Sequence, residues 1–301
     1  MTLRTQIAGS MVALVTPMQR DGQVDHGALR ALVDWHIESG TDAIIAVGTT
    51  GESSTLDVAE HMAVVTAVVH QVAGRLPVIA GTGANATDEA ITLTRLAHSV
   101  GADAALSVTP YYNKPPQEGL RRHYAAIAEA CELPLILYNV PGRTGCDLLP
   151  ETVGKLLDFP HVVGIKEAGG NQERMRALLE LGRGVVVYSG DDATARESML
   201  LGVRGDISVT ANVAPAAMHK MCAAAMAGDA QEALRWDAPL GALHRDLFCQ
   251  PSPIPVKWCL QQMGRIPSGL RLPLVPLGAE FEPRMRDALA EAGITFGEAA
   301  Q

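Results

Sequence analysis

The stretch Val162-Val163-Gly164-Ile165-Lys166-Glu167 is an apolar run that ends in a lysine, with Gly169-Gly170 shortly after it. Such a run favours a buried strand, which would present the Lys166 amine at its carboxyl end. A free lysine has a pKa of about 10.4, so a nucleophilic lysine needs burial or a nearby cation to lower it. A lysine held in this way forms Schiff bases with carbonyl substrates. The alternative is an ordinary strand-end lysine paired with a carboxylate such as Glu167.

The same pattern recurs along the chain, where eight apolar runs are each followed by a polar, glycine-rich loop and a helical pattern. The expected strands are residues 11–15, 43–47, 77–80, 104–108, 135–138, 162–165, 185–188 and 207–209. The expected helices include residues 25–39, 57–73, 87–99, 117–131, 150–157, 172–181 and 193–201. The helix starts lie at or beside Asp57, Thr87 and Asp192. Glycines stand where helices should stop, at Gly40, Gly74, Gly101 and Gly202.

Strands that are apolar on both faces and alternate with helices indicate a parallel sheet covered by helices. Eight such units by about residue 215 predict a (β/α)8 TIM barrel over residues 1–222, with a C-terminal helical extension over 223–301. An open doubly wound sheet is the alternative. It would usually carry a G-x-G-x-x-G turn, which this chain lacks.

The composition sets broad limits on the class of protein. The chain has 301 residues, of which 48% are hydrophobic, and this suits one large domain with an ample core. A formal net charge of −9 argues against nucleic acid or an anionic membrane as a partner. The five cysteines form no C-x-x-C pair. Neither a signal peptide nor an apolar run of transmembrane length is found, so we expect a cytoplasmic protein.

In a barrel of this type, function lies at the carboxyl ends of the strands. The loop Gly48-Thr49-Thr50-Gly51-Glu52-Ser53 offers backbone amides and hydroxyls near a helix start, so it is either an anion cradle or a capped turn. A carboxylate is favoured over a phosphate, because Asp191, Asp192 and Asp206 follow or enter the last two strands and would repel phosphate.

Metal and cofactor chemistry find little support in the sequence. The nine histidines fall in expected helices or, for His161, before a strand, so we expect none at the catalytic rim and no metal. Pyridoxal phosphate would need a phosphate site that we do not find. We therefore expect no cofactor.

A nucleophilic amine without a cofactor suggests a small keto acid as the substrate. Lys166 would attack the ketone, while Thr49 and Thr50 would hold its carboxylate. Tyr138, at the end of the preceding strand, could move protons, although a tyrosine at the end of a strand is more often a core residue with a satisfied hydroxyl. Arg143 could receive a second carboxylate or form a surface salt bridge.

Four motifs together resemble the dihydrodipicolinate synthase family. They are residues 48–53, Val108-Thr109-Pro110-Tyr111-Tyr112-Asn113, Tyr138-Asn139-Val140-Pro141-Gly142-Arg143-Thr144 and Gly164-Ile165-Lys166-Glu167. That family belongs to the pyruvate-dependent class I aldolases, which include N-acetylneuraminate lyase. The likeness covers nearly the whole chain, and Tyr111, Tyr112 and Arg143 favour the synthase branch.

The resemblance implies a lyase of lysine and diaminopimelate biosynthesis that condenses pyruvate with aspartate 4-semialdehyde to 4-hydroxy-tetrahydrodipicolinate. It implies a Lys166 imine, with Thr49, Tyr138 and Tyr112 as the proton relay and Tyr112 reaching the partner subunit's site. Substrate contacts would come from Thr50, Arg143, Gly190 and Ile207. The family is usually a homotetramer, a dimer of dimers.

The resemblance also implies feedback inhibition by L-lysine at a site made by Ser53, Ser54, His61, Asn85, Glu89 and Tyr111. Val58 stands where sensitive members often have histidine, so we expect weaker inhibition. Two other positions depart from the family pattern. Asp206 replaces an apolar strand residue and would need a partner such as Arg204 or Arg196. Ser252 replaces a common asparagine, and we expect little effect from this change.

Two other functions remain as alternatives to the synthase. One is a different Schiff-base aldolase or hydratase of the same superfamily, with another acceptor. The other is a catalytically silent barrel used for binding, although Lys166 and Tyr138 are both present.

Overall fold

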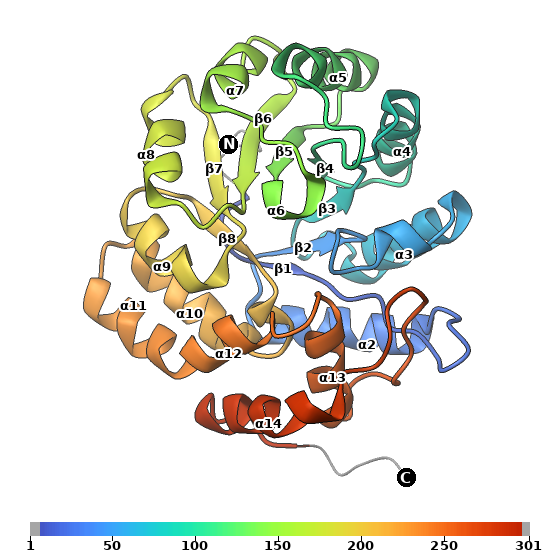
Figure 1. The fold of residues 1–301 in the computed structure, drawn as a ribbon, viewed down its shortest axis with the longest axis vertical. Coiled ribbons are helices and arrows are strands. Elements are labelled where there is room, and N and C mark those ends of the chain that lie inside the picture. Colours follow the sequence, from blue (N-terminus) through green and yellow to red (C-terminus); the bar gives the residue numbers. More distant parts are fainter. Residues whose placement is uncertain (1–6, 297–301) are drawn as a thin grey trace.

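The computed structural model describes residues 7–296, in which eight parallel strands close into a barrel in chain order (Figure 1). The strands are β1 (Gly9–Ala13), β2 (Ala43–Ala46), β3 (Val78–Gly81), β4 (Ala104–Val108), β5 (Leu135–Asn139), β6 (Val162–Glu167), β7 (Val186–Ser189) and β8 (Gly205–Ser208). Strand β8 pairs with β1 and so closes the cylinder. The expected (β/α)8 barrel is confirmed, and the open sheet is excluded.

A helix follows each strand and returns the chain along the outside of the barrel (Figure 1). These helices are α2 (His26–Glu38), α3 (Val58–Val72), α4 (Thr87–Ser99), α5 (Gln117–Ala130), α7 (Pro150–Leu156), α8 (Gln172–Glu180), α9 (Asp192–Leu200) and α10 (Pro215–Met226). One short helix, α6 (Pro141–Thr144), lies in the link between β5 and α7. This link carries Arg143 toward the catalytic end of the barrel.

Local chemistry explains where the helices begin and end. The Asp57 carboxylate caps α3 by accepting from the Glu60 amide at 2.8 Å. Helix α9 is capped by Asp191 rather than by Asp192, and Thr87 is the first residue of α4 rather than its cap. Left-handed glycines follow four of the helices, as expected, at Gly40, Gly74, Gly101 and Gly202.

Two layers of apolar side chains bury both faces of the strands. Met11, Ile45, Ile79, Leu106 and Ile207 belong to a cluster that fills the barrel interior. A larger cluster packs the outer faces of the strands against the helices. Because both faces of these strands are buried, their sequences are mostly continuous apolar runs and do not alternate between apolar and polar residues.

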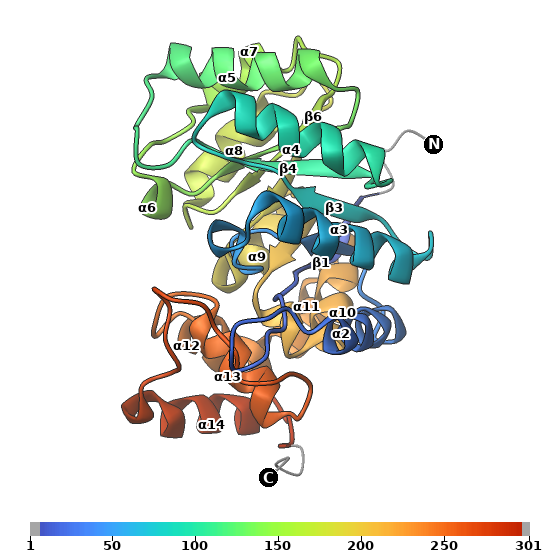
Figure 2. The ribbon, with the colours of Figure 1, turned by 90° about the vertical axis from the view of Figure 1, so that its right-hand side faces the viewer.

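The chain after α10 is helical, with α11 (Ala230–Asp237), α12 (Gly241–Asp246), α13 (Ile254–Gln262) and α14 (Glu282–Glu291). Helices α12, α13 and α14 gather on one side of the barrel, beyond α10 and α2 (Figures 1 and 2). The boundary expected at residue 222 falls inside α10, because that helix packs on β1 and continues to Met226. Among the described residues, every helix is too short or too polar to cross a membrane.

Candidate active site

A cavity of about 260 Å³ lies at the carboxyl ends of the strands. Six of the eight residues expected to act on substrates line it, namely Thr49, Thr50, Tyr138, Arg143, Lys166 and Gly190. They come from the loop after β2, from β5 and β6, from helix α6 and from the end of β7. The barrel therefore brings together side chains that lie up to 141 residues apart in the chain, from Thr49 to Gly190.

Lys166 and Tyr138 are direct neighbours across the β5–β6 pair. Both are buried, with 6% and 7% of their surfaces exposed. The Lys166 Nζ lies 4.5 Å from the centroid of the Tyr138 ring. Within residues 7–296 no carboxylate forms an ion pair with Lys166. The alternative of a strand-end lysine serving only as an ion-pair partner therefore does not fit this geometry.

Gly190 makes room for the stem of that lysine. A Cβ atom at this position would lie 2.3 Å from the Lys166 Cε and 2.8 Å from the Ala168 Cβ. The Gly190 amide also donates to the Glu167 carbonyl at 2.8 Å. Any larger residue would push the amine out of place, so glycine is a requirement of the site.

The ends of β5 and β6 are locked together on their outer face. The Asn139 Nδ2 donates to Glu167 at 2.9 Å and to Asp147 at 2.8 Å. Burial raises the pKa of Glu167, while the bond from Asn139 opposes that rise. Because side chains alternate along a strand, this contact lies behind Tyr138 and Lys166 and holds their register. We did not identify Asn139 as a site residue from the sequence, although its position after Tyr138 is the available signal.

The loop of residues 48–53 is anchored from behind by a buried ion pair. Glu52 adopts a left-handed conformation with φ of 59°, and its carboxylate meets the Lys257 Nζ at 2.5 Å. Both side chains are almost fully buried, at 0% and 3% exposed. Lys257 also donates to the Thr16 carbonyl at 3.0 Å. The C-terminal helices thus hold the loop that presents Thr49 and Thr50.

Arg143 is exposed at the cavity entrance, on α6. No ion pair to Arg143 is formed by the residues that the structure describes. The alternative of a surface salt bridge is therefore not seen, and the guanidinium is free to meet an incoming anion.

A second cavity of about 260 Å³ adjoins the first and shares Thr49, Val140 and Arg143 with it. Five of the six residues expected to bind lysine line it, namely Ser53, Ser54, His61, Glu89 and Tyr111. Asn85 does not line it and instead accepts a hydrogen bond from the Asn113 side chain at 2.9 Å through its backbone. Burial lowers the pKa of His61, so this residue offers a neutral imidazole, whereas Glu89 offers a carboxylate.

A model of the Dihydrodipicolinate synthetase family matches residues 6–292. The chain belongs to this family. Curated relatives called 4-hydroxy-tetrahydrodipicolinate synthase include proteins of Alcanivorax borkumensis, 61% identical, and Pseudomonas aeruginosa, 58% identical, each over 289 residues. These matches cover 96% of this chain and 98% and 99% of the two relatives.

Solved structures of family members have the same fold. The chloride-inhibited dihydrodipicolinate synthase of Acinetobacter baumannii, complexed with pyruvate, is 57% identical with a TM-score of 0.95, over 96% of this chain and 100% of that one. The enzyme of Cyanidioschyzon merolae, with lysine bound, is 40% identical with a TM-score of 0.91, over 96% and 99%.

Asp206 is completely buried in β8. Neither of its oxygens has a well-formed hydrogen bond within the described residues, and the Asp192 carboxyl is a close neighbour. Burial and the charge of Asp192 raise its pKa well above the usual value. The expectation that Arg196 pairs with it was wrong, since Arg196 binds Asp237 and Glu197 instead. Arg204 is exposed and makes no such pair either.

Two expected site residues lie outside the cavity. Ile207 is buried among the side chains of the barrel interior, so only its backbone could meet a substrate. Tyr112 is 90% exposed, with φ of 75°, and its amide donates to the Thr144 carbonyl at 3.2 Å. Its ring therefore points away from the cavity of its own chain.

The lining also includes residues that were not expected as site residues, among them Asp191, His244, Phe248 and Ser252. The expectation that no histidine reaches the catalytic rim was wrong, because His244 on α12 lines the cavity and bonds to Thr210, just after β8. No signal within residues 241–252 alone shows that these helices fold back onto the barrel. Within residues 7–296, no group of three or more His, Cys, Asp or Glu residues is arranged to hold a metal ion.

Proposed function

We propose that this chain is a 4-hydroxy-tetrahydrodipicolinate synthase, which condenses pyruvate with aspartate 4-semialdehyde through a Schiff base on Lys166. The observation that carries the proposal is the buried Lys166 amine, which lies against Tyr138 and has no ion-pair partner among the described residues. The activity named for relatives that are about 60% identical over nearly the whole chain supports it.

Each step of the reaction assigns a task to a residue of the cavity. The Lys166 amine adds to the ketone carbon of pyruvate, and loss of water from the carbinolamine leaves an imine. Loss of a methyl proton then gives an enamine, which attacks the aldehyde carbon. The amine of the condensed product can displace Lys166 from the imine carbon, which closes the ring and frees the enzyme. Tyr138 and Thr49 would move the protons.

The charges of the cavity suit the two substrates. Thr50 and the amides of its loop would hold the pyruvate carboxylate, since the loop offers no competing anion to the cavity. Arg143 would bind the carboxylate of the semialdehyde at the entrance. A different Schiff-base aldolase or hydratase remains the second candidate, since Lys166 and Tyr138 alone would serve that chemistry equally well.

Borohydride reduction tests the proposal, because it traps an imine as a stable amine. With pyruvate present, we expect the trapped adduct on the peptide that contains Lys166, and none in Lys166→Arg. Condensation with aspartate 4-semialdehyde is then compared with that of other small aldehydes. Trapping without preference for the semialdehyde would favour the second candidate. The absence of any trapped adduct would refute both.

We further propose that L-lysine inhibits the enzyme by binding in the second cavity. Glu89 would pair with the ammonium group of the side chain, and Ser53, Ser54 and Tyr111 would offer hydrogen bonds to the amino-acid backbone. The lysine-bound relative supports this regulation. Rates measured over micromolar to millimolar lysine test it, with Glu89→Gln as the variant that should lose inhibition. Full activity of the parent enzyme at millimolar lysine would exclude the proposal.

We also propose that the enzyme works in the cytoplasm as a homotetramer, a dimer of dimers. The position of Tyr112 supports an assembly, because its ring is 90% exposed and lies outside the cavity of its own chain, so it could act on a substrate only in a second subunit. Light scattering would test the mass of the assembly.

A further inference from the structure

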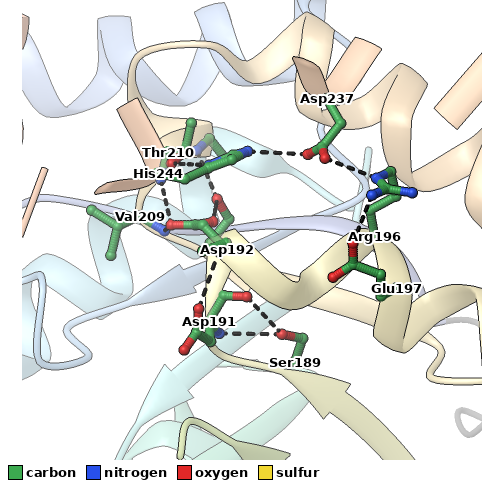
Figure 3. Close-up of polar contacts among 12 residues, drawn as sticks. Ser189, Asp191, Asp192, Arg196, Glu197, Val209, Thr210, Asp237 and His244 are labelled. Atoms are coloured by element: carbon green, nitrogen blue, oxygen red, sulfur yellow. Dashed lines mark hydrogen bonds and ion pairs between the residues drawn. The ribbon is translucent and has the colours of Figure 1, made fainter. Parts of the chain in front are cut away.

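His244 joins two parts of the molecule at the wall of the catalytic cavity. It belongs to α12, and its side chain is only 4% exposed. Both ring nitrogens are engaged (Figure 3): Nδ1 with the Thr210 hydroxyl at 2.9 Å, and Nε2 with the Asp237 carboxylate at 3.2 Å. A histidine bonded at both nitrogens has a fixed ring orientation.

The hydrogen-bond partners of Asp237 show which atom is the donor in each bond of His244. Burial tends to raise the pKa of Asp237, but the bonds from His244 and Arg196 prevail and hold it below the usual value. The Arg196 Nε donates to this carboxylate at 2.9 Å. An ionised carboxylate only accepts hydrogen bonds, so the His244 Nε2 carries the hydrogen. In the neutral ring Nδ1 is then the acceptor, and the Thr210 hydroxyl donates to it.

Thr210 lies in the rim that follows β8, and this rim is held on several sides. The amides of Val209 and Thr210 donate to the Asp192 carboxylate at 3.1 and 3.0 Å, and the Ser208 hydroxyl donates to the same group. Asn212 ties the rim to β1 through the Val15 amide at 3.1 Å. The hydrogen bond between Thr210 and His244 ties this rim to the C-terminal helices.

The residues that line the cavity come from different elements of the fold. The residues proposed to bind pyruvate come from β5, β6 and the loop after β2. Gly190 and Asp191 at the end of β7 and Arg143 on α6 also line the cavity, and Val209, His244, Phe248 and Ser252 form the wall that comes from the β8 rim and the C-terminal helices. In this wall the Ser252 hydroxyl is buried and has no hydrogen-bond partner among the described residues. A buried hydroxyl without a partner in a cavity wall is available to hydrogen-bond a group of the ligand.

We propose that His244 is a positioning residue for the acceptor: held by Asp237, it fixes the β8 rim through Thr210 and sets the wall against which the aldehyde docks. The proposal rests on the Schiff-base function given above. Because this wall is separate from the residues assigned to pyruvate, imine formation proceeds without the His244–Thr210 bond, whereas condensation depends on it.

Variants of Thr210 and His244 test this dependence. Thr210→Val keeps the size of the side chain and removes the hydroxyl, Thr210→Ser restores the hydroxyl, and His244→Gln leaves a polar group of similar length. His219→Gln is the control, because His219 on α10 also bonds an aspartate at 3.0 Å, namely Asp42, which directly precedes β2 at the end of the barrel opposite the cavity. Each protein is assayed for borohydride-trapped pyruvate, for kcat, for KM of the aldehyde and for melting temperature.

We expect Thr210→Val and His244→Gln to trap pyruvate as the parent does but to lose about tenfold or more in kcat/KM for the aldehyde. Thr210→Ser should recover most of this loss, and His219→Gln should match the parent. Equal losses in trapping and condensation, or a lower melting temperature with unchanged kinetics, would overturn the proposal. If Thr210→Val does not fold, the ratio of trapping to condensation in His244→Gln decides.

Failure of the proposed function would be seen in the parent enzyme, not in a difference between the parent and its variants. A parent enzyme that traps no pyruvate refutes the Schiff-base function itself. A parent that traps pyruvate but condenses another aldehyde refutes only the acceptor, and the variants are then compared on the aldehyde that is consumed.

Discussion

Individual charges decide which substrates the catalytic cavity can hold. Lys166 and Arg143 supply positive charge, and Asp191 is the acidic group among the lining residues. Burial, together with the neighbouring Asp192, raises the pKa of Asp191, which weakens its negative charge at lower pH. A cavity with this balance favours two carboxylates, one on each substrate, and this agrees with the proposed pair of pyruvate and aspartate 4-semialdehyde.

Asp206 gives a prediction about stability. Its raised pKa means that the folded chain keeps a proton that the unfolded chain releases above a pH of about 3.9. The free energy of unfolding therefore falls as the pH rises from there toward the folded-state pKa. We expect Asp206→Val to remove this fall and to stabilise the protein at pH 8 by about 1–3 kcal/mol, measured by denaturant unfolding from pH 5 to 9.

Asp206→Asn provides the control for this experiment. The amide does not titrate, so the pH dependence should disappear, but a buried polar group remains and much of its cost should persist. If Asp206→Val proves less stable than the parent at pH 8, the buried carboxyl makes a stabilising interaction in the folded protein, and the prediction is wrong.

Val58 gives a prediction about regulation. It lines the second cavity at the start of α3 and is 43% exposed, so a larger side chain has room there. An imidazole would add a hydrogen-bonding group beside Glu89 and His61. We expect Val58→His to lower the lysine concentration for half inhibition several-fold without changing the uninhibited rate. Val58→Leu is the apolar control, and the same gain in Val58→Leu would contradict a role for the imidazole.

At the level of whole elements, the barrel could be predicted because most strands are apolar runs and four of the helices are followed by a glycine, at Gly40, Gly74, Gly101 and Gly202. The bounds of β1 were harder to predict from the sequence, since β1 covers Gly9–Ala13 rather than residues 11–15. The apolar run continues past the strand, but after the Leu14 amide, which still bonds to Ile45, the Val15 amide turns to the Asn212 side chain. A contact across 197 residues has no local signal.

Residues of the cavity also differ in whether the local sequence locates them. Lys166, Tyr138 and the loop of residues 48–53 lie at strand ends, and strand ends can be located from sequence. His244 and Ser252 reach the cavity only because the C-terminal helices dock on the barrel. Docking depends on the packing of distant apolar surfaces, which the periodicity of a single helix does not specify.

The Glu52–Lys257 pair gives a prediction at the scale of elements, because it joins α13 to the loop after β2. Lys257→Met would leave a buried carboxylate without its partner, and we expect a loss of about 3–5 kcal/mol in stability. Without the ion pair the loop that presents Thr49 and Thr50 is held less firmly, and we therefore expect a higher KM for pyruvate. Adding Glu52→Gln to this variant removes the stranded charge and should restore most of the stability. Equal instability of the single and double variants would show that packing, not charge, explains the loss.

At the scale of the whole molecule, one exposed residue bears on the proposed assembly. The catalytic cavity contains Lys166, Tyr138 and Thr49, yet Tyr112, the third member of the proposed proton relay, is 90% exposed on the outside. A relay that needs this hydroxyl requires a second copy of the chain, with the partner subunit's Tyr112 inserted into the cavity. Symmetric dimers allow such an exchange, since each copy then gives and receives the same residue.

Mixing two inactive variants tests this exchange of residues. Tyr112→Phe subunits keep Lys166 but donate no hydroxyl, whereas Lys166→Ala subunits donate Tyr112 but form no imine. In a mixed dimer, the cavity of the Tyr112→Phe subunit receives a complete set. Random mixing by co-expression should restore about a quarter of the parent activity, because half of the dimers are mixed and each has one working site. Activity that stays at the level of the single variants would place the whole relay within one subunit and exclude a catalytic need for the dimer.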